Sequence, residues 1–103
     1  MQIYGLKNCD TCRKAAKALP HADLIDIRAT PLPDNVLLAA HRQFGDALLN
    51  MRSTTWRGLP EADRQGEPLD LIRAHPALMK RPLIDADGTL HLGWGPQVQA
   101  ALL

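Results

Sequence analysis

The stretch Cys9-Asp10-Thr11-Cys12 lies between a short apolar run, Ile3 to Leu6, and a run with helical spacing, Arg13 to Leu19. It contains both cysteines of the chain. Residues three apart in a helix share a face about one turn from each other, so a thiolate at Cys9 can form a disulfide that Cys12 closes or resolves. The spacing therefore predicts a redox pair.

A zinc ribbon is the alternative for two cysteines at this spacing, and it requires a second pair of ligands. The four histidines are scattered singly, at His21, His41, His75 and His91. None has the spacing of a second ligand pair. We therefore expect no metal site and treat the histidines as surface or cap residues.

The composition describes one ordinary domain spanning residues 1–103. Of its residues 46% are hydrophobic, which suffices for a single core. The formal charge of +1 gives no reason to expect nucleic acid or a membrane as a direct partner. No segment approaches the roughly 18 apolar residues of a membrane span, and no secretory signal is evident. We expect a cytoplasmic protein, where a close cysteine pair is catalytic, sensing or metal-binding.

The first third of the chain has the pattern of a βαβ unit. Gln2 to Gly5 predicts a strand, and Asp23 to Ile27 predicts a second strand parallel to the first. Asn8 or Asp10 is expected to cap the helix between them, and Pro20 ends it. The buried stripe of that helix is predicted at Cys12, Ala15, Ala16 and Leu19.

The middle of the chain predicts helices without strands. One helix starts at Pro33 or Asp34 and runs to about Phe44, stopping at Gly45, and another runs from about Pro68 to His75. The buried residues expected of these helices are Val36, Leu37, Ala40, Phe44, Leu69, Leu71 and Ile72.

The segment from Met51 to Arg57 is polar and predicts a loop. In it, Thr54, Thr55 and Trp56 either line a substrate groove or pack down on the core. Asp46 to Asn50 predicts a short helical turn before this loop.

The end of the chain predicts a hairpin and a closing helix. Arg81 to Leu92 contains two apolar runs joined by Asp87-Gly88, a strong hairpin signal. A helix opens at Gly95-Pro96, with Val98, Ala101 and Leu102 expected to pack inward.

The element order is therefore β-α-β, an all-helical insertion over about residues 34–75, and β-β-α. A four-stranded mixed sheet with a Cys-x-x-Cys at the first strand-to-helix turn is the α/β layout of the thioredoxin fold.

The sequence resembles the arsenate reductase (ArsC)/Spx/YffB family of thioredoxin-like proteins over essentially its full length, and most closely the YffB branch. The stretches that carry the resemblance are Ile3 to Ala15, Ala47 to Arg57, His75 to Leu83 and Leu92-Gly93-Trp94. The resemblance implies a catalytic cysteine at Cys9 and an arginine before a cis-proline at Arg81-Pro82. It also implies that the helical insertion is the family's own addition to the thioredoxin core.

The sequence departs from the arsenate reductases of this family at three positions. The resemblance implies that those enzymes hold the oxyanion with three arginines. Only one of the three has a direct counterpart in this chain, which is Arg81. Asn50 stands at the position of the first arginine, and Arg52, two residues further on, is a candidate substitute. The position of the last arginine falls at about Gly93. A histidine that precedes the cysteine loop in those enzymes is replaced by Gly5. These departures argue against arsenate as the natural substrate.

Cys9 is the expected nucleophile, because a helix N-terminus and nearby cations lower the pKa of a thiol. The cations expected to act on it are Lys7, Arg13, Lys14 and Arg81. Cys12 is either the resolving partner or a buried core residue, with resolution by an outside thiol such as glutathione. Arg81 and Arg52 are expected to hold an anion, since a guanidinium offers a bidentate fork. The other residues expected at the substrate are Asn8, Asp10, Thr11, Arg13 and Pro82.

These inferences predict a thiol-disulfide oxidoreductase with no tightly bound cofactor and with glutathione as co-substrate, acting on a small anionic or disulfide substrate. Two alternatives remain open. One is arsenate reduction by the same cysteine. The other is a redox-sensing regulator resembling Spx, which binds RNA polymerase and uses a disulfide between Cys9 and Cys12 as its switch.

Overall fold

The computed structural model describes all of residues 1–103, and the chain forms two compact units. Residues 1–30 and 81–103 make one unit, which we call the sheet unit. Residues 31–80 make the other, which we call the helical unit. The expectation of one domain spanning residues 1–103 stays a prediction.

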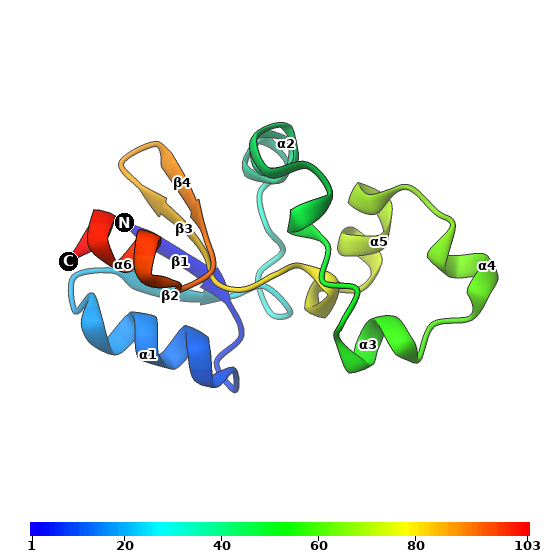
Figure 1. Ribbon diagram of the computed structural model, residues 1–103, viewed down its shortest axis with the longest axis horizontal. Helices are drawn as coiled ribbons and strands as arrows, with labels where there is room; N and C mark the ends of the chain where they lie inside the picture. Colours follow the sequence, from blue (N-terminus) through cyan, green and yellow to red (C-terminus); the bar gives the residue numbers. More distant parts are fainter. The chain divides into compact units, whose positions relative to one another are not determined.

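The sheet unit is built on four strands in the order β2-β1-β3-β4 (Figure 1). Their bounds are β1 Gln2–Gly5, β2 Asp23–Asp26, β3 Leu83–Ala86 and β4 Thr89–Leu92. Strand β1 pairs in parallel with β2 and antiparallel with β3, and β3 pairs antiparallel with β4. The predicted mixed sheet is confirmed, including the direction of every pairing that the βαβ and hairpin patterns imply.

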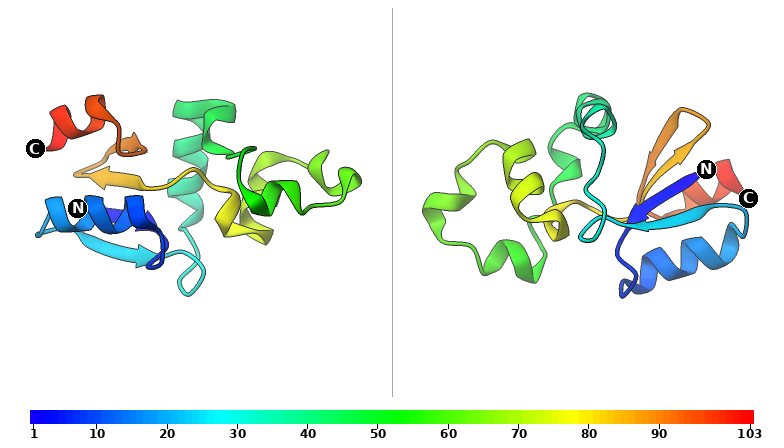
Figure 2. Two further views of the ribbon diagram at one scale, coloured as in Figure 1. Left: turned by 60° about the horizontal axis from the view of Figure 1, so that its bottom comes forward. Right: turned by 180° about the vertical axis from the view of Figure 1, so that it is seen from behind.

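Two helices, α1 (Asp10–Ala18) and α6 (Pro96–Leu102), pack on one face of this sheet. The core between them and the strands is made by the buried residues Ile3, Ala15, Leu19 and Ile84, against which Val98, Leu102, Trp94 and others pack. Ala101 is exposed, so its predicted inward position is wrong, because Val98 and Leu102 already define the inner face of this two-turn helix. The two chain ends lie near each other at one end of the unit (Figure 2).

The hairpin between β3 and β4 turns at Asp87 and Gly88, with φ angles of 51° and 91°. Two successive positive φ values are the requirement of the tight turn that matches strand twist, and Asp-Gly is suited to it. The carboxylate of Asp85 accepts a hydrogen bond from the Gly88 N–H at 2.9 Å. The hairpin prediction is confirmed.

The helical unit contains short helices and no strand of the sheet. Their bounds are α2 Asp34–Phe44, η1 Gly45–Leu48, α3 Thr54–Arg57, α4 Glu61–Arg64, α5 Pro68–Ala74 and η2 Pro76–Leu78. Helix α2 ends at Gly45, whose φ of 60° stops helical propagation. Arg73 on α5 pairs with Asp34 at the start of α2 at 3.1 Å. Of the predicted core residues here, Leu69 and Phe44 are half-buried and the others are buried.

The predicted loop from Met51 to Arg57 is wrong in its second half, because helix α3 begins at Thr54. Ser53 caps this helix: its hydroxyl accepts a hydrogen bond from the Trp56 N–H at 3.1 Å and donates to the Asn50 carbonyl at 2.9 Å. Arg64 of α4 then donates to the carbonyls of Trp56 and Arg57, at 3.2 and 2.9 Å. These capping and tethering bonds make a helix from a segment whose composition resembles a loop.

No helix is long and apolar enough to cross a membrane.

Candidate active site

Cys9 lies at the N-cap of α1, directly after a turn that leaves β1. The Cys9 N–H donates to the Leu6 carbonyl at 3.1 Å, which closes the turn, and the Cys9 carbonyl accepts from the Arg13 N–H at 3.0 Å, which opens the helix. The predicted capping by Asn8 or Asp10 is wrong, because Cys9 itself takes the N-cap position. The carboxylate of Asp10 pairs instead with Arg13 at 2.7 Å on the exposed first turn.

The sulfur of Cys9 is half-buried in a setting that favours its thiolate. Burial alone would raise the pKa of Cys9. Hydrogen bonds from the backbone N–H and the thiol of Cys12, and from the side chain of Arg81 together with its charge, outweigh burial and hold that pKa below its ordinary value. The arrangement is that of a nucleophilic thiolate.

Cys12 is fully buried on the inner face of α1 and has the opposite character. Burial raises the pKa of Cys12 to about 11, a hydrogen bond from the backbone of Leu6 opposes this, and the neighbouring Cys9 sulfur raises it further. Cys12 therefore keeps its proton at neutral pH, and its S–H group donates a hydrogen bond to the Cys9 sulfur. The two thiols form an unequal pair, one poised to ionise and one held neutral.

Arg81 reaches Cys9 from the start of the hairpin. The Arg81-Pro82 peptide bond is cis, as the resemblance implied. Pro82 is fully buried, and its carbonyl accepts a hydrogen bond from the Gly93 N–H at 2.8 Å, which fixes it beside the end of β4. Of the cations expected around Cys9, Arg81 is the one that acts on its pKa. Lys7, Arg13 and Lys14 are exposed to solvent, which screens their charge.

The other predicted site residues of the sheet unit surround Cys9 in the turn and the first helical turn. Asn8, Asp10, Thr11 and Arg13 are all exposed. The side chain of Asn8 accepts a hydrogen bond from Arg28 at 3.0 Å, a partner that the sequence analysis did not identify. Their contacts with substrate stay a prediction.

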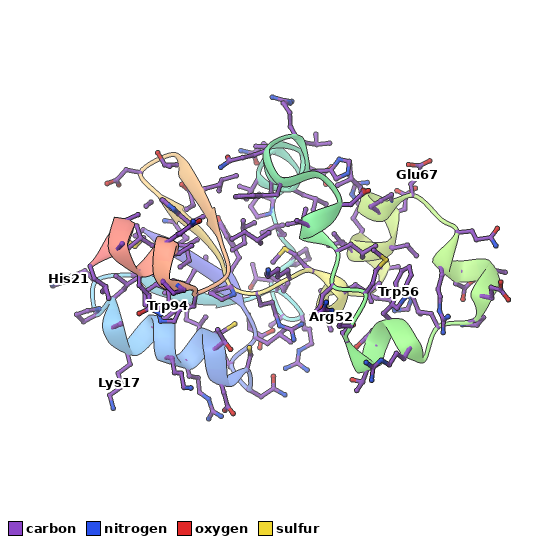
Figure 3. The ribbon with its side chains drawn as sticks, viewed as in Figure 1. Lys17, His21, Arg52, Trp56, Glu67 and Trp94 are labelled. Carbon is purple, nitrogen blue, oxygen red and sulfur yellow. The ribbon has the colours of Figure 1, made fainter.

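Arg52 belongs to the helical unit, in the segment before α3 (Figure 3). Its exposed side chain lines a groove of about 580 Å³. The groove is lined by Asp46, Ala47, Leu49, Asn50, Met51, Arg52 and Lys80. Two of these side chains, Arg52 and Lys80, are cationic and one, Asp46, is anionic, so the charged side chains of the lining carry one net positive charge. The role of Arg52 in substrate binding stays a prediction.

Two further residues shape the site: Gly5, noted above only as standing in place of a histidine, and Asp26, which the sequence did not indicate. A Cβ atom built on Gly5 would collide with the Sγ atom of Cys12 and lie 3.2 Å from its Cβ. The Asp26 carboxylate accepts the Lys7 N–H of the turn before Cys9 at 3.1 Å. The parallel pairing of β1 with β2 could have indicated Asp26, since it places the carboxyl ends of both strands at one edge.

No cluster of three or more His, Cys, Asp or Glu side chains is placed to hold a metal ion. The chemistry that this arrangement supports is that of sulfur: a thiolate at a helix N-terminus, a neutral thiol beside it and a guanidinium facing it.

A mixed four-stranded sheet with a Cys-x-x-Cys opening the first helix and a cis-proline opposite defines a thioredoxin-like thiol protein. The chain belongs to the ArsC family, whose model matches residues 4–101. It is 41% identical to an uncharacterized protein of Haemophilus influenzae, over 96% of both chains.

Two solved structures resemble it closely. One is described as the YFFB (PA3664) protein, with a TM-score of 0.88 and 31% identity over 99% of this chain and 97% of that one. The other is an arsenate reductase (ArsC) related protein from Brucella melitensis, with a TM-score of 0.71 and 33% identity over 97% of this chain and 91% of that one.

Proposed function

We propose that this protein is a thiol-disulfide oxidoreductase of the ArsC family that uses Cys9 as its nucleophile and glutathione as its co-substrate, in a reducing compartment such as the cytoplasm. The observation that carries the proposal is the contrast between the two cysteines. Cys9 is half-buried and its pKa is lowered by Cys12 and Arg81, whereas Cys12 is fully buried and stays protonated. Disulfide exchange requires a thiolate at the attacking sulfur, and this arrangement supports one at Cys9.

The first step is attack of the Cys9 thiolate on the glutathione sulfur of a mixed disulfide RS–SG. A new bond forms between Cys9 Sγ and the glutathione sulfur, the substrate S–S bond breaks, and RS⁻ leaves and takes up a proton from solvent. A second glutathione thiolate then attacks the glutathione sulfur held on Cys9. Oxidised glutathione forms, and the electron pair of the broken bond returns to Cys9 as thiolate. The sum is RS–SG + GSH giving RSH + GSSG.

In this scheme Cys12 is a hydrogen-bond donor to the nucleophile. Its pKa of about 11 leaves little thiolate at neutral pH, and its sulfur is enclosed on the inner face of α1. An external thiol that approaches the partly exposed Cys9 has the easier route to the mixed disulfide. An internal disulfide between Cys9 and Cys12 is the competing second step, and it makes a different prediction for substitution of Cys12.

The anionic groups of glutathione fit the cations that this chain offers. The guanidinium of Arg81 faces Cys9 and suits a carboxylate, since it presents a planar fork of donors. Asn8, Thr11 and Arg13 are exposed residues close to Cys9 in the sequence and are further candidates for contact with glutathione. Arg52, in the helical unit, is another candidate.

The experiment gives the protein a glutathione mixed disulfide as substrate and reduced glutathione as electron donor. The release of the free thiol RSH measures turnover. Cys9→Ser should abolish activity, whereas Cys12→Ser should keep most of it, because a serine hydroxyl still donates to Cys9. Full activity of Cys9→Ser would overturn the proposal. Loss of activity in Cys12→Ser, with a disulfide between Cys9 and Cys12 accumulating in the wild type, would replace the glutathione step by the internal disulfide.

Arsenate reduction is the second candidate, favoured by membership of the ArsC family and by the resemblance to the ArsC-related protein of Brucella melitensis. The same preparation, given arsenate and glutathione, tests it directly. We expect no arsenite, because Asn50 and Gly93 stand where the arginines of the arsenate reductases are expected.

A further inference from the structure

The carboxylate of Asp26, at the end of β2, holds the turn that leads from β1 to Cys9. One oxygen accepts a hydrogen bond from the Lys7 N–H at 3.1 Å. The other accepts from the Arg28 N–H at 2.9 Å. A carboxylate that accepts two backbone N–H groups is held in its ionised form, and the pKa of Asp26 is accordingly lowered, first by the Lys7 bond and then by the Arg28 bond.

Arg28, two residues after the end of β2, links Asp26 to Asn8, the residue of the turn that follows Lys7. Its guanidinium donates to the side-chain oxygen of Asn8 at 3.0 Å and lies 3.6 Å from the carboxylate of Asp26. The side chain of Asp26 is 11% exposed, so this ion pair is partly shielded from water. Lys7 and Asn8, the two middle residues of the turn, are thus both held from the neighbouring strand.

The turn decides where the sulfur of Cys9 lies. Its first and last residues are joined by the bond from the Cys9 N–H to the Leu6 carbonyl. The end of β1 is fixed to the residue that follows β2 by the bond from the Ile27 N–H to the Gly5 carbonyl at 3.0 Å. Gly5 and Asp26 are also register partners in the sheet. Cys9 is therefore positioned by β2 as well as by its own helix.

We propose that Asp26 and Arg28 are positioning residues for the nucleophile: through Lys7 and Asn8 they hold Cys9 where the Cys12 amide and the Arg81 guanidinium reach its sulfur. The inference rests on the proposed role of Cys9 as nucleophile. Neither residue touches the sulfur. Both act through the backbone geometry of the turn.

The sign of the effect separates positioning from simple electrostatics. Removing the negative charge of Asp26 would by Coulomb's law favour the Cys9 thiolate and lower its pKa. Loosening the turn would separate the sulfur from its donors and raise that pKa. The effect on Cys9 thus points in opposite directions for the two roles.

The experiment measures the pH dependence of Cys9 alkylation by iodoacetamide, followed by mass spectrometry of the cysteine peptides, in folded protein. Asp26→Asn should move the midpoint upward, so that one pH unit below the wild-type midpoint the rate falls about threefold or more. Asp23→Asn is the matched control: it removes the same charge from the exposed start of the same strand and should leave the profile unchanged.

Asn8→Ala supplies a test without a change of charge. It removes the acceptor of Arg28 on an exposed residue and should also move the midpoint upward, by less than Asp26→Asn does. If Asp26→Asn does not fold, Asn8→Ala decides by the same readout. A midpoint that stays or falls in the variants would overturn the positioning role while leaving Cys9 as nucleophile. A wild-type Cys9 that alkylates like an ordinary thiol would instead overturn the proposed function.

Discussion

The Sγ atom of Cys12 occupies the space that a side chain at Gly5 would need. The buried sulfur packs directly over the end of β1, and a Cβ at Gly5 would collide with it. Gly5 is the position where the resemblance to the arsenate reductases leads us to expect a histidine, and the contact leaves no space for such a side chain. In this chain a buried Cys12 sulfur leaves no room for a side chain at position 5.

Gly5→Ala should therefore destabilise the protein by about 1–3 kcal/mol, the usual cost of overpacking a filled core. Urea unfolding followed by circular dichroism measures the change in the free energy of unfolding. Cys12→Ala in the same chain removes the sulfur and should recover part of this loss. The contact would be disproved if the effects of the two substitutions were simply additive.

Arg81→Gln should raise the pKa of Cys9, because it removes both a hydrogen bond to the thiolate and a positive charge beside it. We expect the rate of Cys9 alkylation below the wild-type midpoint to fall about three- to tenfold. Arg13→Gln is the control, since Arg13 is exposed and paired with Asp10. An equal effect of both substitutions would mean that Cys9 responds to general surface charge and not to Arg81.

Asp26 should make stability depend on pH in the acid range. Its folded-state pKa lies below the ordinary value of 3.8, so its contribution is fully present above that value and is lost as the pH falls through the folded pKa. Urea unfolding of the wild type and Asp26→Asn should differ at pH 7 and converge toward pH 2, whereas Asp23→Asn should follow the wild type. A constant difference between wild type and Asp26→Asn at all pH values would contradict the linkage.

Ser53→Ala should cost about 1 kcal/mol of stability through loss of the cap of α3. Ser53→Thr keeps a hydroxyl acceptor for the Trp56 N–H and should cost less. Both are measured by urea unfolding. Equal loss in the two variants would show that the hydroxyl bond is not what stabilises this helix.

The fold was predictable because its signals are local. The Asp87-Gly88 turn, the prolines beside the helix ends and the β-favouring Ile3 and Tyr4 of β1 are signals carried by short segments of sequence. Helix α3 was missed because its stability comes from the Ser53 cap and from Arg64, whose bonds to the carbonyls of Trp56 and Arg57 cross a break in the sequence pattern. Hydrogen bonds between separate segments, such as those of Arg64, produce no hydrophobic periodicity in the sequence from which a helix could be predicted.

The site was predictable at Cys9 and less so around it. The spacing indicated the cysteine pair and the burial of Cys12 on the inner stripe of its helix. The space for the Cys12 sulfur beside the end of β1 depends on Gly5, a contact that the spacing does not reveal. The two positions at which the resemblance leads us to expect arginines have other local roles in this structure. Asn50 uses its side chain to accept the Arg52 N–H at 3.1 Å, opening the turn before α3. Gly93 has a φ of 84°, which favours glycine over any L residue.

The most direct test of the account is to incubate the folded protein with oxidised glutathione at neutral pH and locate the adduct by mass spectrometry of the cysteine peptides. We predict a mixed disulfide on Cys9, formed faster as the pH rises through the lowered pKa of that thiol, and none on Cys12. An adduct on Cys12, or no adduct while Cys9 remains a free thiol, would contradict the assignment of Cys9 as nucleophile.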